Sequence, residues 1–313
     1  MVVGPGVGLD AAAIDFGGRY LLAKTDPITF IAEEIGSYVL TINANDLATM
    51  GATPRWLLAT VLLPAGSTSA LQVKRIFTHL RLACRQLSVT LCGGHTEITD
   101  AVTRPVVVGC LLGECSKGHL VTSAGAKAGD IVLLTKGIPI ETVSILARER
   151  AEELRRRYSA SFVARCRRFL SRPGISVMRD AQLALAAGGV HAMHDPTEGG
   201  LSSALYELAE ASHVGLRIEQ RAIRILPEGA RLCSDFGLDP LGAIASGALL
   251  ICAASRRVEA IQHRLSVGGI AVSKIGQVVP RTQAVRLEKA DGSSRRFPRF
   301  AVDEIARFFQ SPP

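Results

Sequence analysis

The chain has 313 residues, of which 48% are hydrophobic and 20% charged, and its 36 basic and 28 acidic side chains give a net charge of +8. This length and composition predict a globular protein of two domains and exclude a disordered chain, a fibre and a repeat array. The positive charge suits an anionic partner such as a nucleotide, without selecting one.

The weakly polar stretches and the cysteines favour a reduced, cytoplasmic protein. Residues 241–254 are fewer than the about 20 apolar residues that cross a bilayer, so they predict a buried element and no membrane span. No basic region precedes the first apolar residues, and no signal peptide is predicted. The seven cysteines form an odd set without a CxxC pair, which favours core thiols over disulfides or a zinc ribbon.

Hydrophobic periodicity in the first half predicts alternating strands and helices, and therefore an α+β or α/β fold. Residues 11–16 and 20–24 flank a Gly-Gly turn and predict a hairpin. Residues 34–50 have helical spacing, and residues 56–63 predict a buried strand. Ser67 or Thr68 can cap a helix to about residue 85, with Leu71, Ile76, Leu80 and Leu87 on one face. Further strands are predicted at 89–92 and 106–112.

A composition shift over residues 122–129 predicts the domain boundary, giving domains 1–125 and 126–313. In the second domain, helices are predicted at 141–158, 177–187, 198–212, 230–236 and 303–309. Strands are predicted at 131–135 and near Val190, Leu216, Leu249 and Val272. The segment 148–172 holds nine arginines and three glutamates. Its Glu-to-Arg spacing of four is typical of a solvated helix, and few aromatic residues accompany it, so nucleic-acid binding is disfavoured.

The opening GPGVGLD is rich in glycine but has neither the ending of a P-loop nor the context of a dinucleotide fingerprint. Closely spaced glycines let backbone N–H groups approach an anion, and the adjacent Asp10 could hold a cation that the anion shares. A simple glycine-rich terminus explains the spacing equally well.

Three further aspartates lie in apolar surroundings, namely Asp26, Asp46 and Asp195. A buried carboxylate must be hydrogen-bonded, paired or metal-bound, and oxygen ligands from separate segments are what Mg²⁺ uses. Each also has a structural explanation: Asp26 precedes a proline, Asp46 can lie on a solvated helix face, and Asp195 can cap a helix. His95, His191 and His194 fit no zinc spacing and are interpreted as structural.

Seven motifs in order resemble the aminoimidazole-ribonucleotide synthetase (PurM-like) superfamily, and especially its HypE-like hydrogenase-maturation branch. They are GLDAA (8–12), KTD (24–26), NANDLATMGATP (43–54), GGHTE (93–97), TKG (135–137), HDPTEGGL (194–201) and GLDPLGAIASGALL (237–250). The resemblance implies an N-terminal domain whose four-stranded sheet dimerises into a barrel, and a C-terminal α/β domain. It also implies ATP and Mg²⁺ as cofactors.

By motif, the resemblance implies Asp10, Asp26, Asp46 and Asp195 as magnesium ligands. It implies a nucleotide-binding set of Gly4, Gly6, Gly8, Lys24, Thr25, Asn45 and Lys136. The expected chemistry is phosphoryl transfer to an amide- or carboxylate-like oxygen, with no catalytic side chain identified.

The sequence also departs from this branch. The hydrogenase-maturation proteins have a C-terminal acceptor cysteine, whereas the last cysteine here is Cys252, and His95 and Glu198 replace residues common in relatives. Two alternatives therefore stay open. One is a nucleotide-binding maturation or scaffold protein that docks a partner through segment 148–172, and the other is a purine-pathway cyclo-ligase.

Overall fold

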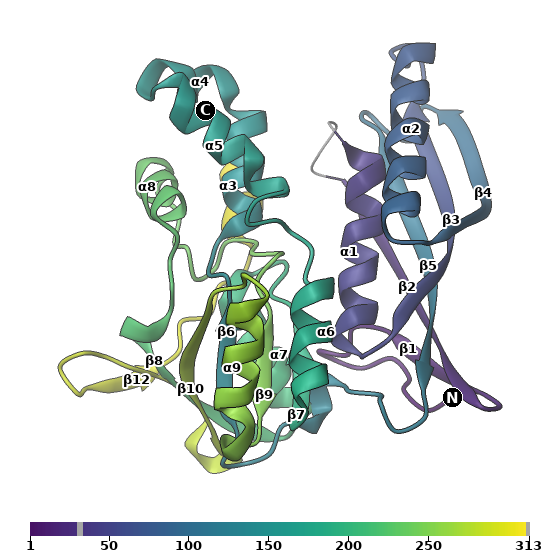
Figure 1. Ribbon diagram of the computed structural model, residues 1–313. Helices are drawn as coiled ribbons and strands as arrows, with labels where there is room; N and C mark the ends of the chain where they lie inside the picture. The colour runs from purple at the N-terminus through teal and green to yellow at the C-terminus, as the bar shows by residue number, and fades with distance from the viewer. Residues whose placement is uncertain (30–33, 311–313) are drawn as a thin grey trace. The chain divides into compact units, whose positions relative to one another are not determined.

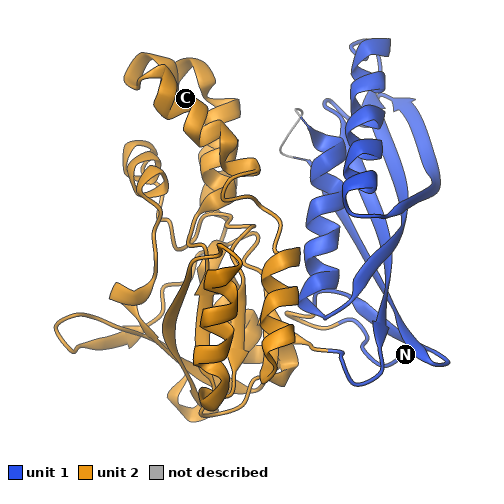
Figure 2. Cartoon of the chain, in the orientation of Figure 1, with its two compact units in different colours: residues 1–5, 10–120 blue, residues 6–9, 121–313 orange. Residues whose placement is uncertain are grey.

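The computed structural model describes residues 1–29 and 34–310, and the chain divides into two compact units (Figures 1 and 2). Unit 1 comprises residues 1–5 and 10–120, and unit 2 comprises residues 6–9 and 121–313. The composition shift placed the boundary after residue 125, whereas unit 2 already includes residues 121–125. The Ser212 hydroxyl donates to the carbonyl of Ser123 and accepts from the N–H of Ala126, which fixes this segment to unit 2.

Unit 1 is built on one sheet of β1 (Ala12–Phe16), β2 (Arg19–Ile28), β3 (Thr53–Pro64), β4 (Thr90–Thr99) and β5 (Val106–Ser116). Among the described residues the sheet has five strands in the order β1-β2-β5-β3-β4, and only β3 and β4 run parallel. The hairpin predicted around the Gly-Gly turn is confirmed. The four-stranded sheet is wrong, because β1 adds an edge strand to β2.

Helices α1 (Ile35–Thr49) and α2 (Ala70–Gln86) cover one face of this sheet (Figure 1). Two glycines of β5 let α1 lie close to the sheet: a Cβ at Gly109 would approach the Asn43 amide to 2.7 Å, and one at Gly113 would approach Leu47 to 2.5 Å. The predicted cap of α2 is wrong by one residue, because the side chain of Ser69 accepts the hydrogen bond from the N–H of Gln72.

The predicted apolar faces need two corrections in unit 1. Leu71 is 58% exposed, because the buried face of α2 consists of Ile76, Leu80, Ala83 and Cys84. The strand predicted as buried at 56–63 is buried on one side only. Trp56 and Leu58 are 37% and 40% exposed, because they point away from the helices, to the open face of the sheet. Side chains alternate between the two faces of a strand, so half of β3 is uncovered.

Unit 2 contains a second sheet, formed by β6 (Ile131–Thr135), β7 (Val190–His194), β8 (Val214–Glu219), β9 (Leu250–Ala253), β10 (Val272–Pro280), β11 (Val285–Glu288) and β12 (Ser294–Arg296). Among the described residues its order is β12-β11-β8-β10-β6-β9-β7, and β8 and β11 form its one parallel pair. The second domain is therefore α+β. The α/β expectation is wrong because the neighbouring strands are mostly antiparallel.

The helices of unit 2 are α3 (Ile140–Glu149), α4 (Ala151–Arg157), α5 (Ala160–Arg167), α6 (Met178–Ala187), α7 (Gly200–Ala211), α8 (Pro227–Phe236), α9 (Val258–Val267) and α10 (Glu304–Gln310). Helix α7 packs with the sheet to form the core, and α6 packs on α9. The single helix predicted at 141–158 is wrong. The backbone leaves helical geometry at Arg150, whose guanidinium lies 4.9 Å from the ring centre of Phe308.

Residues 241–254 confirm the prediction of a buried element, since β9 and the residues before it are almost wholly inaccessible to solvent. Among the described residues, no helix combines the length and the apolar character that crossing a bilayer requires.

Candidate functional site

Three of the predicted site residues meet in unit 1. Lys24 and Asp26 are two residues apart on β2 and therefore share the face that α1 covers. The Lys24 Nζ atom lies 3.1 Å from Asp46 Oδ2 on α1 and 3.3 Å from Asp26 Oδ2. The Asp46 side chain is only 6% exposed, so the explanation that it lies on a solvated helix face is wrong. This set of one cation and two carboxylates is called the lysine cluster below.

The charge of Lys24 is fixed by its two neighbours. Burial alone would favour the neutral amine, but the carboxylates of Asp46 and Asp26 outweigh that effect and raise the pKa of Lys24 above its usual value. The ammonium is therefore charged at every physiological pH. One positive charge against two negative charges leaves the lysine cluster with a net charge of −1.

Asp10 is joined to the same helix through Thr49, which sequence reasoning missed. The Thr49 hydroxyl donates to Asp10 Oδ2 at 2.8 Å and lies 2.7 Å from the carbonyl oxygen of Asp46. Thr49 follows Asp46 by three residues on α1, and this helical spacing is the signal that could have identified it. Asn45 is fully buried on the same helix.

Thr25 is separated from the lysine cluster. It lies between Lys24 and Asp26 on β2, so its side chain points to the opposite, open face of the sheet. Lys24 and Thr25, two members of the predicted nucleotide-binding set, therefore lie on opposite faces of the sheet of unit 1.

Residues 6–9 of the glycine-rich opening have a defined position in unit 2. The hydroxyl of Ser123 donates a short hydrogen bond to the carbonyl of Gly8, and the N–H of Leu9 donates to the carbonyl of Gly6. Gly8 has φ +70°, and a Cβ there would meet the backbone oxygen of Glu207 at 2.7 Å. Only glycine fits this position, so the explanation of a loose terminus does not apply to residues 6–9.

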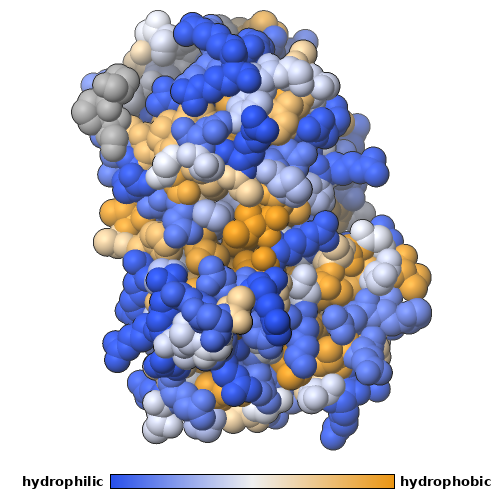
Figure 3. All heavy atoms as spheres, turned by 90° about the vertical axis from the view of Figure 1, so that its left-hand side faces the viewer, coloured by the Kyte–Doolittle hydropathy of each residue, from blue (hydrophilic) through white to orange (hydrophobic). Residues whose placement is uncertain are grey.

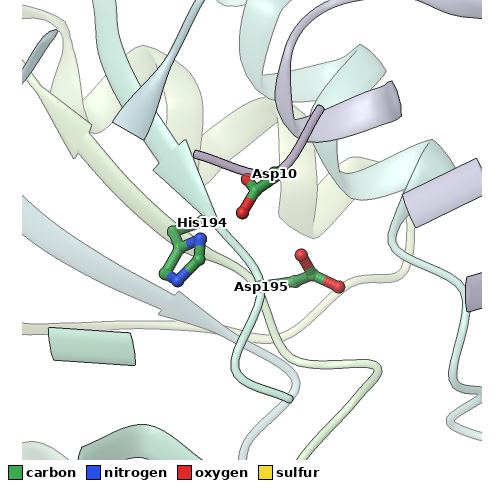
Figure 4. Close-up of side chains that lie close together, drawn as sticks. All are labelled: Asp10, His194 and Asp195. Atoms are coloured by element: carbon green, nitrogen blue, oxygen red, sulfur yellow. The ribbon is translucent and has the colours of Figure 1, made fainter. Parts of the chain in front are cut away.

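The fourth predicted metal ligand, Asp195, belongs to unit 2. It directly follows β7, is 1% exposed and lies next to His194 (Figure 4). His194 Nε2 lies 2.8 Å from Glu207 Oε2. Asp195 does not cap helix α7. The residue before that helix is Gly199, and its N–H donates to Asp303 Oδ2 at 2.7 Å.

Two adjacent glycines shape the segment after Asp195. Gly199 and Gly200 have φ +74° and +60°, and a Cβ at Gly200 would meet the backbone oxygen of Ala243 at 2.5 Å. The DPTEGG motif thus permits close contact between the start of α7 and residues 241–243.

Carboxylates gather around this segment of unit 2. Glu141, in the first turn of α3, is buried, and its Oε2 has no hydrogen-bond partner among the described residues. Burial, together with the charges of Glu198, Asp303 and Asp195, raises the pKa of Glu141 to about 8. Burial also raises the pKa of Asp303 despite its bonds from backbone N–H groups. The region therefore has a negative potential that a cation would relieve.

Lys136 forms contacts wholly within unit 2. Its Nζ donates to the carbonyls of Ser176 and Gly247 at 2.6 and 2.9 Å, and it lies 3.1 Å from Asp180 Oδ2. These three acceptors match the three protons of an ammonium. Burial, only partly offset by Asp180, lowers its pKa. A contact with a nucleotide would require the exchange of one of these partners.

The remaining motif residues have structural surroundings. His191 Nδ1 lies 2.9 Å from Asp130, and exposed His95 lies 3.9 Å from Glu97. Cys252 is buried in β9, and burial raises the pKa of its thiol. A thiol in the core is a poor nucleophile because the thiolate is the reactive form.

Several arginines of the segment 148–172 have partners within unit 2. Arg157 pairs with Glu153 at 2.8 Å, Arg165 pairs with Glu228 at 3.0 Å, and Arg148 donates to the carbonyl of Arg167. Figure 3 shows hydrophilic side chains over the end of unit 2 where α4 and α5 lie.

The first unit combines a helix-covered sheet with the lysine cluster, and the second unit contains the DPTEGG segment. The sequence matches the AIR synthase related protein, N-terminal domain over residues 8–115 and the AIR synthase related protein, C-terminal domain over residues 127–288. The chain belongs to the AIR synthase-related family, which confirms the resemblance seen in the motifs.

Within this family the chain is similar to HypE proteins. It is 30% identical over 254 residues to carbamoyl dehydratase HypE of Cupriavidus necator, covering 78% of this chain and 68% of that protein. The crystal structure of hydrogenase maturation protein HypE in complex with ATP superposes with a TM-score of 0.77 at 24% identity, covering 94% and 89% of the two chains. AaThiL complexed with AMPPCP and TMP gives 0.74 at 20% identity, covering 94% and 90%. These structural likenesses establish the two-sheet PurM-like fold.

Proposed function

We propose that this protein is an ATP- and Mg²⁺-dependent enzyme that transfers a phosphoryl group to an amide- or carboxylate-like oxygen. The observation that carries the proposal is the lysine cluster, in which a buried and a partly buried carboxylate are already arranged around a cation, in a family with ATP-bound relatives. A buried carboxylate needs hydrogen bonds, an ion pair or a metal ion to offset the cost of its charge.

The donor atoms fit magnesium. Asp10, Asp26, Asp46 and Asp195 offer hard carboxylate oxygens, and Mg²⁺ prefers one or two such ligands together with water and phosphate oxygens. In unit 1, Asp26 and Asp46 already attract one cation, the ammonium of Lys24, and this supports the assignment of a metal ion to these carboxylates. When bound, Mg²⁺ would offset charge on the phosphoryl oxygens of ATP.

The residues of the chain would then orient the nucleotide and the acceptor. The backbone N–H groups of loop 4–8 are suited to bind phosphate oxygens. Lys24 on β2 and Asn45 on α1 lie on the helix-covered side of the first sheet, where they could bind an anion. No side-chain nucleophile is needed, because phosphoryl transfer depends mainly on position and electrostatics. Cys252 is unsuited to accept a carbamoyl group, because its thiol is buried.

The direct test is thermal unfolding of the purified protein with Mg²⁺ alone, with ATP alone and with both. A ligand at 100 times its dissociation constant adds about 2.7 kcal/mol to the folded state, which raises Tm by several degrees. We expect the full shift only with both ligands. No shift would contradict the proposal and favour a partner-binding member of the family.

The residue-level test is Asp46→Asn, with Asp15→Asn as its matched control. Both remove one negative charge from unit 1, but Asp15 is exposed and pairs with Lys117 at 2.9 Å. We expect Asp46→Asn to lower Mg-dependent ATP affinity by about 10-fold or more and Asp15→Asn to leave it unchanged. Equal affinities in the two variants, with circular dichroism spectra like the parent's, would remove Asp46 from the site.

We further propose that two copies pair through the open face of the first sheet. This face is apolar across several strands, including Ile14, Trp56 and Leu58, which are each more than a third exposed. A hollow of about 470 Å³ beside Trp56 and Leu112 adds to it. Exposed apolar surface of this kind marks an interface, and a second copy offers the same surface in return.

The second candidate function is a nucleotide-dependent partner protein. Two observations favour it: a structural relative is a HypE–HypF complex, and Arg155 and Arg156 are exposed. Charge reversal at Arg155 and Arg156 should weaken a complex with such a partner while leaving ATP turnover intact. Equal loss of both would count against this function.

A further inference from the structure

The lysine cluster has a feature that a simple metal site lacks: its cation belongs to the protein. The Lys24 ammonium lies 3.1 Å from Asp46 Oδ2 and 3.3 Å from Asp26 Oδ2, which is direct ion-pair contact with both carboxylates at once. Both carboxylates are among those that the proposed function assigns to Mg²⁺, which in this unit also include that of Asp10. The ammonium and the metal therefore compete for the same two carboxylate groups.

Access to these oxygens is unequal. The Asp46 side chain is 6% exposed, whereas those of Asp26 and Lys24 are 31% and 22% exposed. Asp46 is held in the last turn of the buried helix α1, but Lys24 has four methylene groups between backbone and charge and so can move its ammonium by several ångströms. Of the two groups in the Lys24–Asp46 ion pair, only the lysine ammonium can readily move away.

Charge also favours exchange over simultaneous binding. With Lys24 in place the cluster carries −1, and an incoming Mg²⁺ would lie close to a fixed positive charge. At such short distances repulsion between like charges is strong in a partly buried setting. If the lysine cluster kept both cations, its own charges would sum to +1 until a polyanion arrived.

We propose that Lys24 is the resident counter-cation of the Asp26–Asp46 pair, that a divalent metal displaces its ammonium, and that the released ammonium binds a phosphate oxygen of ATP. This inference rests on the proposed function. Its consequence is coupling: the metal binds weakly alone because it must displace Lys24, and ATP strengthens metal binding because it provides a new partner for the ammonium. By linkage, the metal strengthens ATP binding by the same factor.

The test measures Mn²⁺ binding, as a spectroscopic substitute for Mg²⁺, by the electron paramagnetic resonance signal of the free ion, with and without ATP. The variant is Lys24→Met, and Lys117→Met is the matched control. Lys117 also forms an ion pair in unit 1, with Asp15 at 2.9 Å, but it is exposed. Circular dichroism and thermal unfolding establish that each variant is folded.

For Lys24→Met we expect Mn²⁺ alone to bind at least about tenfold more tightly, because its competitor is gone. The strengthening of Mn²⁺ binding by ATP should shrink toward onefold in that variant and stay unchanged in Lys117→Met. Unchanged or weaker Mn²⁺ binding by folded Lys24→Met would overturn the inference, since it would make the lysine a structural partner only.

A second measurement uses the unaltered protein, in case Lys24→Met does not fold. Lysine acylation is quantified by mass spectrometry without ligand, with Mg²⁺ alone and with Mg²⁺ and ATP. We expect the labelling of Lys24 to rise with saturating Mg²⁺ and to fall when ATP is added, while Lys117 stays constant. If Mg²⁺ and ATP stabilise the protein but the labelling of Lys24 stays constant, the inference about Lys24 is refuted and the proposed function is not. No stabilisation by Mg²⁺ and ATP refutes the proposed function and, with it, the inference.

Discussion

Glu141 provides a sharp test of the electrostatics in unit 2. Its side chain is buried in the first turn of α3, and burial, together with the neighbouring carboxylates of Glu198, Asp303 and Asp195, raises its pKa from 4.5 to about 8. Between these two pH values the folded protein holds a proton on Glu141 that the unfolded chain has already released. Stability must therefore fall as pH rises through this window.

The magnitude follows from the width of the window. Each pH unit contributes about 1.4 kcal/mol, so a rise of about 3.5 pH units gives at most about 5 kcal/mol. Glu141→Gln keeps the shape of the protonated carboxyl and does not titrate. We expect the variant to match the parent near pH 4.5 and to exceed its free energy of unfolding by several kcal/mol at pH 8, with no further gain above that.

The assay is urea unfolding at pH 5, 6, 7, 8 and 9 in the presence of EDTA, which keeps metal from binding the carboxylates. Glu259→Gln is the control, because Glu259 is an exposed glutamate on α9 in the same unit. Its pH profile should coincide with that of the parent protein. Parallel profiles for the parent and Glu141→Gln would refute the reasoning, since they would mean that Glu141 ionises in the folded protein at an ordinary pH.

Two further predictions concern packing and assembly. Lys136→Met should lower the free energy of unfolding by about 3–5 kcal/mol, because it leaves the buried Asp180 carboxylate without its cation. Urea unfolding measures this loss. A loss below about 1 kcal/mol would show that Thr135, which donates a hydrogen bond to Asp180, is a sufficient partner. Leu58→Asp should convert the proposed dimer to monomers, because it places a charge on the open apolar face. Sedimentation velocity measures the oligomeric state, and a parent protein that is already monomeric would contradict the proposed pairing.

Most helices and strands could be predicted from the sequence, but not which face of each strand is packed against other elements and which is exposed. Residues 53–64 are apolar throughout much of their length, and a run of this kind is typical of a strand buried on both sides. In the structure one face of β3 packs under helices and the other carries exposed Trp56 and Leu58. Composition cannot distinguish a face buried within the chain from a face made for a second copy, because both require the same apolar side chains.

The candidate site was predictable as a set of residues and not as an arrangement. The motifs identified Lys24, Asp26 and Asp46, and strand alternation alone places Lys24 and Asp26 on one face, away from Thr25. What the motifs could not give is the partner of Lys24, because its contact with Asp46 depends on which strands pair and which helix covers them. Long-range pairing of this kind leaves no local signal.

The burial of Asp46 has a cause that can be recognised elsewhere in the sequence. The polar stretch 43–46 suggests a solvated helix face, yet all four residues are buried. The cause lies some 60 residues further along the chain, in β5, where Gly109 and Gly113 face α1 and leave room for Asn43 and Leu47. Two glycines at a spacing of four on one face of a strand indicate close approach by another element, and a helix whose residues at the same spacing face them, here Asn43 and Leu47, is the partner. The glycines of β5 thus bring α1 against β2, and this contact holds the carboxylate of Asp46 beside Lys24.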